Sequence, residues 1–80
     1  MNEICRDIFR AIHEGKWLKI EYLNKNGETT HYWIGIKSID VSGEKLIVDG
    51  LDVANYRITE LHIFIRSIKK SSVLDNTFFR

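Results

Sequence analysis

The chain has 80 residues and a net charge of +1, with 44% hydrophobic and 29% charged residues. This size fits one domain with a small core, because so short a chain buries roughly two-thirds or less of its unfolded surface. The near-neutral charge argues against a protein that coats nucleic acid, and no apolar run approaches the roughly 20 residues that span a bilayer.

The expected compartment is the cytoplasm. The N-terminus has no basic region followed by an apolar core, so no secretory signal is predicted. Cys5 is the single cysteine, which excludes an internal disulfide. Its position on the apolar side of a predicted helix indicates a buried thiol rather than a reactive one.

The first element in the chain is a helix, predicted over residues 3–14. Apolar residues recur there at three- and four-residue spacings, so they share one face. They are Ile4, Ile8, Phe9 and Ile12. Gly15 follows where a left-handed residue commonly ends a helix. We expect the helix to bury this face against the rest of the domain.

Two strands and a tight turn are predicted next. Residues 18–22 alternate between apolar and charged side chains, which is the period of a half-buried strand. Asn26 and Gly27 are expected to close a two-residue hairpin with positive φ at both positions. A second strand covers 32–37, and Gly35 in its middle indicates a bend or bulge.

The remaining elements are shorter. Residues 40–43 are predicted to turn, residues 46–48 to form a third strand and residues 50–55 to connect it onward. Residues 61–66 alternate as a fourth strand. Residues 68–74 form a short last strand, or a turn followed by one.

This order predicts a mainly β (α+β) fold, with an N-terminal helix followed by a small antiparallel barrel of four or five strands. A flat sheet of this size would leave both edges unpaired, so a partly open barrel is favoured. The helix would cover about residues 3–14 and the barrel about 17–75. Both belong to one domain, 1–80, which also suits the N-terminal part of a longer protein.

A set of turn and packing positions runs along nearly the whole chain. They are Ala11, Ile12, Gly15, Lys16, Ile20, Tyr22, Asn24, Gly27, Thr30, the strand 46–48, Ile65, Ile68, Val73 and Leu74. In this order and spacing they resemble a WYL domain, a small bacterial sensing and nucleic-acid-binding module. The resemblance implies an Sm-like (Src-homology-3-like) barrel with an N-terminal helix. It also implies sensing of a small anionic or nucleotide-like ligand.

Two segments depart from the family pattern. The Trp-Tyr-Leu triplet aligns with residues 46–48, which are Leu-Ile-Val here. On the fourth strand, Phe64 and Ser67 occupy positions that are basic in many members, and Arg66 stands where an acid is usual. The family's ligand residues are therefore not carried over. The chain resembles the divergent domain attached to bacterial DNA helicases more than that of transcription regulators.

Catalysis finds little support in the sequence. The three histidines (His13, His31 and His62) and the cysteine lack metal-ligand spacing, and no phosphate-binding glycine motif occurs. Asp49 and Asp52 flank a glycine connection and are expected to shape turns. We expect a non-catalytic domain without metal or cofactor, although a parent protein could be a helicase.

Nucleic-acid binding is the first functional hypothesis. Residues 53–80 carry five basic and two acidic side chains, a net +3, against −2 for residues 1–52. Small barrels bind single strands by combining aromatic stacking with a basic track. The candidate residues are Trp33, Lys37, Tyr56, Arg57, Arg66, Lys69 and Lys70, and alternation adds His31, His62 and Phe64 to the same faces. The alternatives are solvated charge at a barrel rim, and burial of Trp33 and Phe64 under the helix.

The second hypothesis is a protein–protein interaction or self-association module that does not contact nucleic acid. Nine aromatic residues in so small a domain exceed what one barrel readily hides. Ile8 and Phe9 with Phe78 and Phe79 would then contact a second copy or a parent protein. Trp17 is instead expected to pack at the helix–strand corner. No membrane partner is expected.

Overall fold

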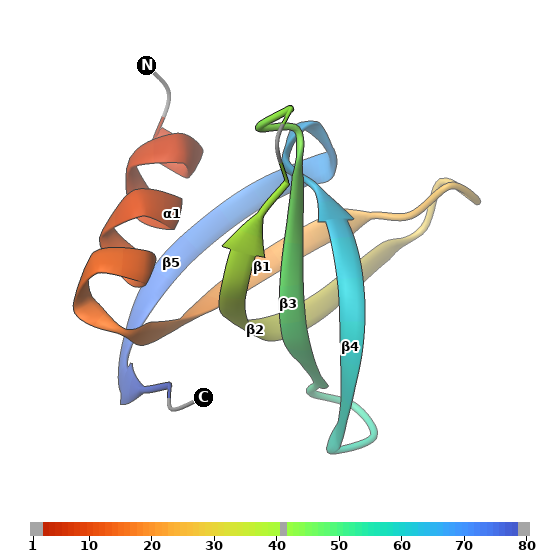
Figure 1. Ribbon diagram of the computed structural model, residues 1–80. Helices are drawn as coiled ribbons and strands as arrows, with labels where there is room; N and C mark the ends of the chain where they lie inside the picture. The colour runs from red at the N-terminus through yellow and green to blue at the C-terminus, as the bar shows by residue number, and fades with distance from the viewer. Residues whose placement is uncertain (1–2, 41, 79–80) are drawn as a thin grey trace.

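One helix is followed by five strands in the computed structural model, which describes residues 3–40 and 42–78 (Figure 1). The elements are α1 (Glu3–Glu14), β1 (Lys16–Leu23), β2 (Thr29–Ile39), β3 (Lys45–Asp52), β4 (Arg57–Phe64), the 3-10 turn η1 (Ile65–Ser67) and β5 (Ile68–Thr77). The strands form one antiparallel sheet in the order β4-β3-β2-β1-β5. This confirms the mainly β fold with an N-terminal helix.

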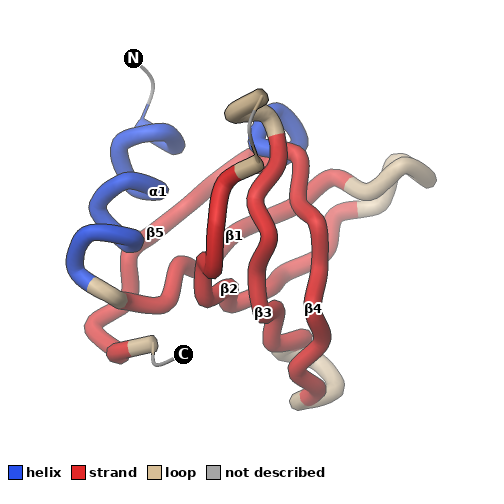
Figure 2. The backbone as a smooth tube through the Cα atoms, viewed as in Figure 1, coloured by secondary structure: helices blue, strands red, loops and turns tan. Residues whose placement is uncertain are grey.

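The sheet is strongly curved but open (Figure 2). β4 and β5 are its edge strands, and no pairing joins them in the described part of the chain. Register shifts between β1 and β5 and between β2 and β3 bend the strands, as bulges do. The predicted barrel is therefore a curled sheet with two edges, one of which, β5, lies beside α1.

Several strands begin or end at other residues than predicted. β3 continues through residues 50–52, so the connection begins only at Val53. β4 starts at Arg57 rather than at residue 61, and Ile65 and Arg66 lie in η1 instead of in the strand. The last strand extends to Thr77.

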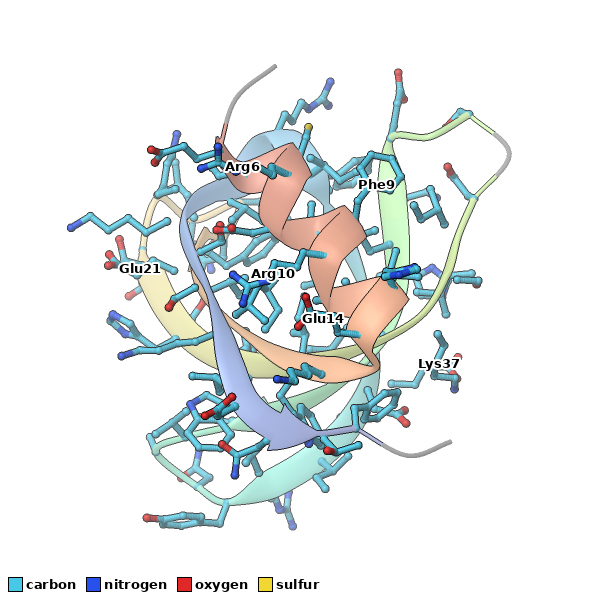
Figure 3. All side chains as sticks on the ribbon, turned by 90° about the vertical axis from the view of Figure 1, so that its left-hand side faces the viewer. Arg6, Phe9, Arg10, Glu14, Glu21 and Lys37 are labelled. Carbon is cyan, nitrogen blue, oxygen red and sulfur yellow. The ribbon has the colours of Figure 1, made fainter. Side chains whose placement is uncertain are left out.

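The helix buries a different face from the predicted one. Ile8 and Ala11 are buried, and Ile4 packs against the core. Phe9 is 58% exposed and Ile12 is 41% exposed, so their predicted burial was wrong. The reason is that the stripe facing β1 and β5 follows the spacing i, i+4, i+7 through Ala11, which leaves Phe9 on one flank (Figure 3).

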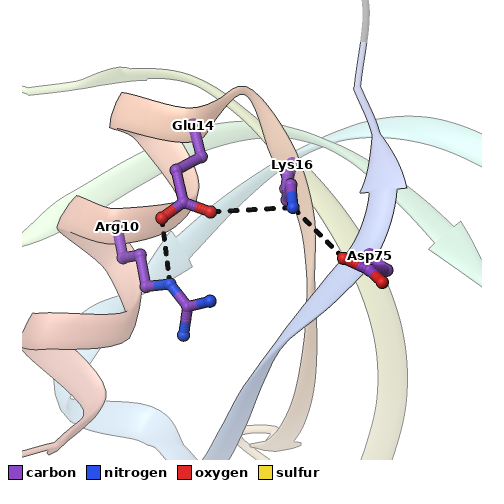
Figure 4. A network of polar contacts seen from close by, with 4 residues as sticks. All are labelled: Arg10, Glu14, Lys16 and Asp75. Carbon is purple, nitrogen blue, oxygen red and sulfur yellow. Dashed lines mark hydrogen bonds and ion pairs between the residues drawn. The ribbon is translucent and has the colours of Figure 1, made fainter.

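Polar contacts fix α1 against the end of the sheet. Arg10 binds Glu14 one helical turn later, and Lys16 binds both Glu14 and Asp75 of β5 (Figure 4). The Ser71 hydroxyl of β5 donates a 2.6 Å hydrogen bond to Asp7 of α1. These contacts hold β5 beneath the helix. The ion pairs are exposed and each stabilises the fold by about 1 kcal/mol or less.

The core lies on the concave side of the sheet, beneath α1. Its residues come from α1 and all five strands, as alternation predicts for a sheet with one buried face. They are Ile8, Ala11, Leu18, Ile20, Ile34, Ile36, Leu46, Val48, Ile63 and Ile68. The opposite side of the sheet is called the outer face below. Cys5 is half-buried rather than fully buried.

The β1–β2 turn has a three-residue loop instead of the predicted two-residue one. The Gly27 N–H donates to the Asn24 carbonyl, and the Asn24 N–H donates to the Glu28 carbonyl. Gly27 has φ +82°, but Asn26 is not among the described residues with positive φ. This is a turn closed by one left-handed glycine. The Asn24 side chain also accepts the N–H groups of Asn26 and Glu28, which favours the longer loop. Gly15, with φ +67°, ends α1 as predicted.

Gly35 serves packing rather than bending. A Cβ at this position would lie 2.1 Å from a ring carbon of Phe78, so only glycine leaves room for that ring. The register shift of β2 falls instead between Ile36 and Ser38, after Gly35. The Phe78 ring meets Trp17 edge-on, with centroids 4.9 Å apart. This confirms that Trp17 packs at the corner.

Within residues 3–40 and 42–78, no helix is long and apolar enough to cross a membrane.

Candidate nucleic-acid interface

An outer row of side chains crosses four strands on the outer face. The strand register places Lys19 of β1 opposite Trp33 of β2, Trp33 opposite Leu51 of β3, and Leu51 opposite Ile58 of β4. Trp33 is half-buried within this row and lies on the side of the sheet away from the core. The alternative that Trp33 is buried under the helix was therefore wrong. Ile58 is 62% exposed, so the row ends in an open apolar residue.

A second aromatic site, the Phe64 cluster, lies at the far end of β4. Lys45 of β3 pairs with Phe64, and its ammonium lies 5.7 Å from the ring centroid. The Arg66 guanidinium carbon, from η1, lies 5.2 Å from the same centroid. Both distances are within the range of cation–π attraction. Phe64 remains 37% exposed, so it is not buried under the helix either.

Lys37 is engaged by acidic neighbours on the outer face. Its ammonium forms ion pairs with Asp49 of β3 and Glu60 of β4. The hydrogen bond with Glu60 raises the pKa of Lys37 and lowers the pKa of Glu60. Asp49 therefore serves as an ion-pair partner within β3, and the prediction that it shapes a turn was wrong.

Tyr56 and Arg57 lie at the β3–β4 turn. The Asp52 carboxylate accepts the Ala54 N–H and the Asn55 side-chain amide, so the prediction that Asp52 shapes a turn is confirmed. Tyr56 follows with φ +54° and is 82% exposed. A tyrosine held outward in the left-handed region is uncommon and presents its ring to solvent.

The basic candidates divide between the two ends of β4. Arg57 begins this strand and Arg66 lies just beyond its end, so they are about 25–30 Å apart at 3.3 Å per residue. Lys69 is exposed on β5 near Arg66, and Lys70 lies 3.8 Å from Glu21. One copy of the domain thus has two separate basic–aromatic sites, with the Lys37 ion pairs between them.

Two lysines at these sites, Lys45 and Lys19, were not among the residues predicted from the sequence. Lys45 and Lys19 become neighbours of Phe64 and Trp33 only through the strand register. Alternation within each strand could have identified them, because every second residue of a strand points to the same face of the sheet. The residues described contain no group of three His, Cys, Asp or Glu side chains that could hold a metal ion.

Comparison with known proteins identifies the fold. No protein-family model matches the sequence, and no curated protein matches it. Among solved structures, a similar arrangement of helix and strands covers 98% of this chain at a TM-score of 0.67 and 12% identity. That structure is Proteasome accessory factor B/C (PafBC) of Arthrobacter aurescens, of whose chain this protein spans 13%. At this identity the likeness shows the fold alone.

Proposed function

We propose that the chain is a WYL-like, non-catalytic regulatory module that binds single-stranded DNA across its outer face. In this proposal it is an accessory domain of a bacterial cytoplasmic DNA helicase or regulator. Two observations support the family assignment. The motif positions resembling WYL domains run along nearly the whole chain, and the fold is similar to part of PafBC.

The Phe64 cluster is the observation that carries the proposal. Its ring is open to solvent and lies within 6 Å of two cations that make no ion pair in the described part of the chain. An unstacked base can stack on Phe64 or on the guanidinium plane of Arg66, while a phosphate binds Lys45. Lys69, exposed nearby, would extend the basic track.

The other predicted residues take secondary roles in this proposal. Trp33, beside exposed Lys19, offers a second stacking position, and Tyr56 with Arg57 offers a third. Lys70 would have to exchange Glu21 for a phosphate. Lys37 is left out of the contact set because Asp49 and Glu60 already surround its ammonium.

Titration of a fluorescent single-stranded oligonucleotide at several salt concentrations tests the proposal. If three phosphates are neutralised, log affinity falls with log salt at a slope of about −2. Arg66→Ala combined with Lys69→Ala should reduce that slope by about 1–1.5. The matched control is Arg6→Ala with Lys25→Ala, which removes the same charge from α1 and the β1–β2 turn. Absence of binding at high micromolar protein in low salt would exclude direct DNA contact. An equal reduction of the slope in both double variants would show that the Phe64 cluster is not the binding site.

A specific observation also favours the protein–protein hypothesis. Exposed Phe9 and Ile12 line a groove together with Ile36, Ile39 and Phe78. Docking of a parent protein here would bury apolar surface and would be nearly independent of salt. The prediction that Ile8 takes part was wrong, because Ile8 is buried in the core. Phe79, also predicted to take part, lies outside the described residues.

A further inference from the structure

The outer edge of β4 is an unusually regular open strand edge. β4 pairs with β3 over eight consecutive residues without a register shift, and no strand of the described chain lies on its other side (Figure 1). Proteins usually protect such edges with Pro, Lys, a bulge or a covering element. β4 contains no Pro or Lys, its pairing with β3 has no bulge, and its only charged residues are Arg57 and Glu60. Residues 57–60 are all exposed.

The hydrogen-bond pattern shows which residues face this edge. The Ile65 N–H donates to the Glu44 carbonyl, so the pair Glu44–Ile65 is hydrogen-bonded. In an antiparallel ladder such pairs alternate, so the odd-numbered residues of β4 bond to β3. Four residues therefore direct their backbone N–H and C=O groups to the open edge. They are Ile58, Glu60, His62 and Phe64.

We propose that two copies of this chain associate by antiparallel pairing of their β4 strands, with the two-fold axis at Leu61. This register places Ile58 opposite Phe64 of the second copy and Glu60 opposite His62 of the second copy. Each pair occurs twice because of the symmetry. Both are favourable cross-strand pairs. One joins an apolar side chain to an aromatic ring, and in the other the second oxygen of the Glu60 carboxylate, whose first oxygen binds Lys37, can accept the imidazole N–H of His62.

The neighbouring registers lack this complementarity. If one β4 strand slides along the other, only a slide of two residues keeps the edge-facing residues opposite one another. Centring the axis on Glu60 would place the two Glu60 carboxylates opposite each other, which is unfavourable. Centring it on His62 would place Glu60 opposite the Phe64 ring. Charge and apolar matching therefore select the Leu61-centred register and a second copy as the occupant of the edge.

The dimer would also join the two basic–aromatic sites. Antiparallel pairing brings the first residue of β4 in one copy, Arg57 with the preceding Tyr56, toward the end of β4 in the other copy, where the Phe64 cluster lies. The two sites that β4 separates within one copy would then form continuous surfaces across the axis. This consequence rests on the proposed function, whereas the dimer itself does not, so the experiment below is done without nucleic acid.

Analytical ultracentrifugation should detect a shift from 9.4 kDa toward twice that mass as the protein concentration rises to about 1 mM, where a small transient interface is populated. Ile58→Lys should abolish the shift, because the lysine would lose the apolar contact and would lie beside Lys45 and Arg66, the two cations that already flank Phe64 in the second copy. Phe9→Lys is the matched control: Phe9 is exposed to a similar extent but lies on α1, and the shift should persist. A monomer at every concentration, or loss of the dimer only in Phe9→Lys, would overturn the proposal.

Disulfide cross-linking in a Cys5→Ser background tests the register. Across the axis, opposing residues 61 lie about 4.5–5.5 Å apart at Cα, within reach of a disulfide. Leu61→Cys should therefore form a covalent dimer under mild oxidation. Glu60→Cys and His62→Cys should not, because their symmetry mates lie two residues away from the opposing position. Preferential cross-linking of either of these would refute the Leu61-centred register.

Discussion

Gly35→Ala should destabilise the fold through one aromatic ring. The added Cβ would lie 2.1, 2.2 and 2.5 Å from three carbons of the Phe78 ring, far inside ordinary contact distance. The ring has to move, because the Phe78 backbone N–H is held by the Gly15 carbonyl at 2.7 Å. Gly35 does not have the positive φ that would itself exclude alanine.

The size of the effect follows from what the ring loses. The edge-on contact with Trp17 contributes about 0.5–1.5 kcal/mol. Re-exposing the half-buried Phe78 ring costs roughly 1 kcal/mol, about half of a full burial. Alanine in a strand recovers about 0.5–1 kcal/mol relative to glycine. The expected net loss in the free energy of unfolding is about 0.5–2 kcal/mol.

Urea titration followed by tryptophan fluorescence and circular dichroism measures this loss. The control is the same substitution in a Phe78→Ala background, where the obstructing ring is absent. There Gly35→Ala should be neutral, or stabilising by up to about 1 kcal/mol. An equal cost in both backgrounds would refute the reasoning, because the effect would then come from the strand and not from the ring.

Three further perturbations test the rest of the fold. Ile8→Ala should cost about 2–5 kcal/mol because Ile8 is buried, whereas exposed Phe9→Ala should cost about 1 kcal/mol or less; comparable losses in urea titration would show that the helix packs differently. Gly27→Val should destabilise the β1–β2 turn, since a β-branched residue resists φ +82°, and an unchanged melting temperature would contradict this turn. The hydrogen bond from the Ser42 hydroxyl holds the pKa of Asp40 below its ordinary 3.8. The ionised carboxylate therefore stabilises the fold above that pH, and the contribution is lost as the pH falls through the folded pKa. Asp40→Asn should therefore reduce the fall in the free energy of unfolding at acidic pH. An unchanged fall would show that Asp40 does not contribute to it.

Local patterns in the sequence were sufficient for the elements and the fold class. The helix over residues 3–14, its end at Gly15 and the alternation in the first, second and fourth strands each depend on neighbours within a few residues. Such patterns specify which side chains share a face. They placed Trp33 and Phe64 on the same faces as basic residues, but left open whether those faces were exposed or covered by the helix.

Only the tertiary structure decided which faces were covered and which side chains met. Phe9 and Ile12 share an apolar stripe with Ile8, but the angle at which α1 lies on β1 and β5 leaves them exposed. Contacts between residues far apart in the sequence could not be predicted either. The fit of Phe78 over Gly35 depends on strand register and curvature, which arise from packing across the whole sheet. The same holds for the meeting of Lys45, Phe64 and Arg66, since β3 and η1 bring the two cations to one ring.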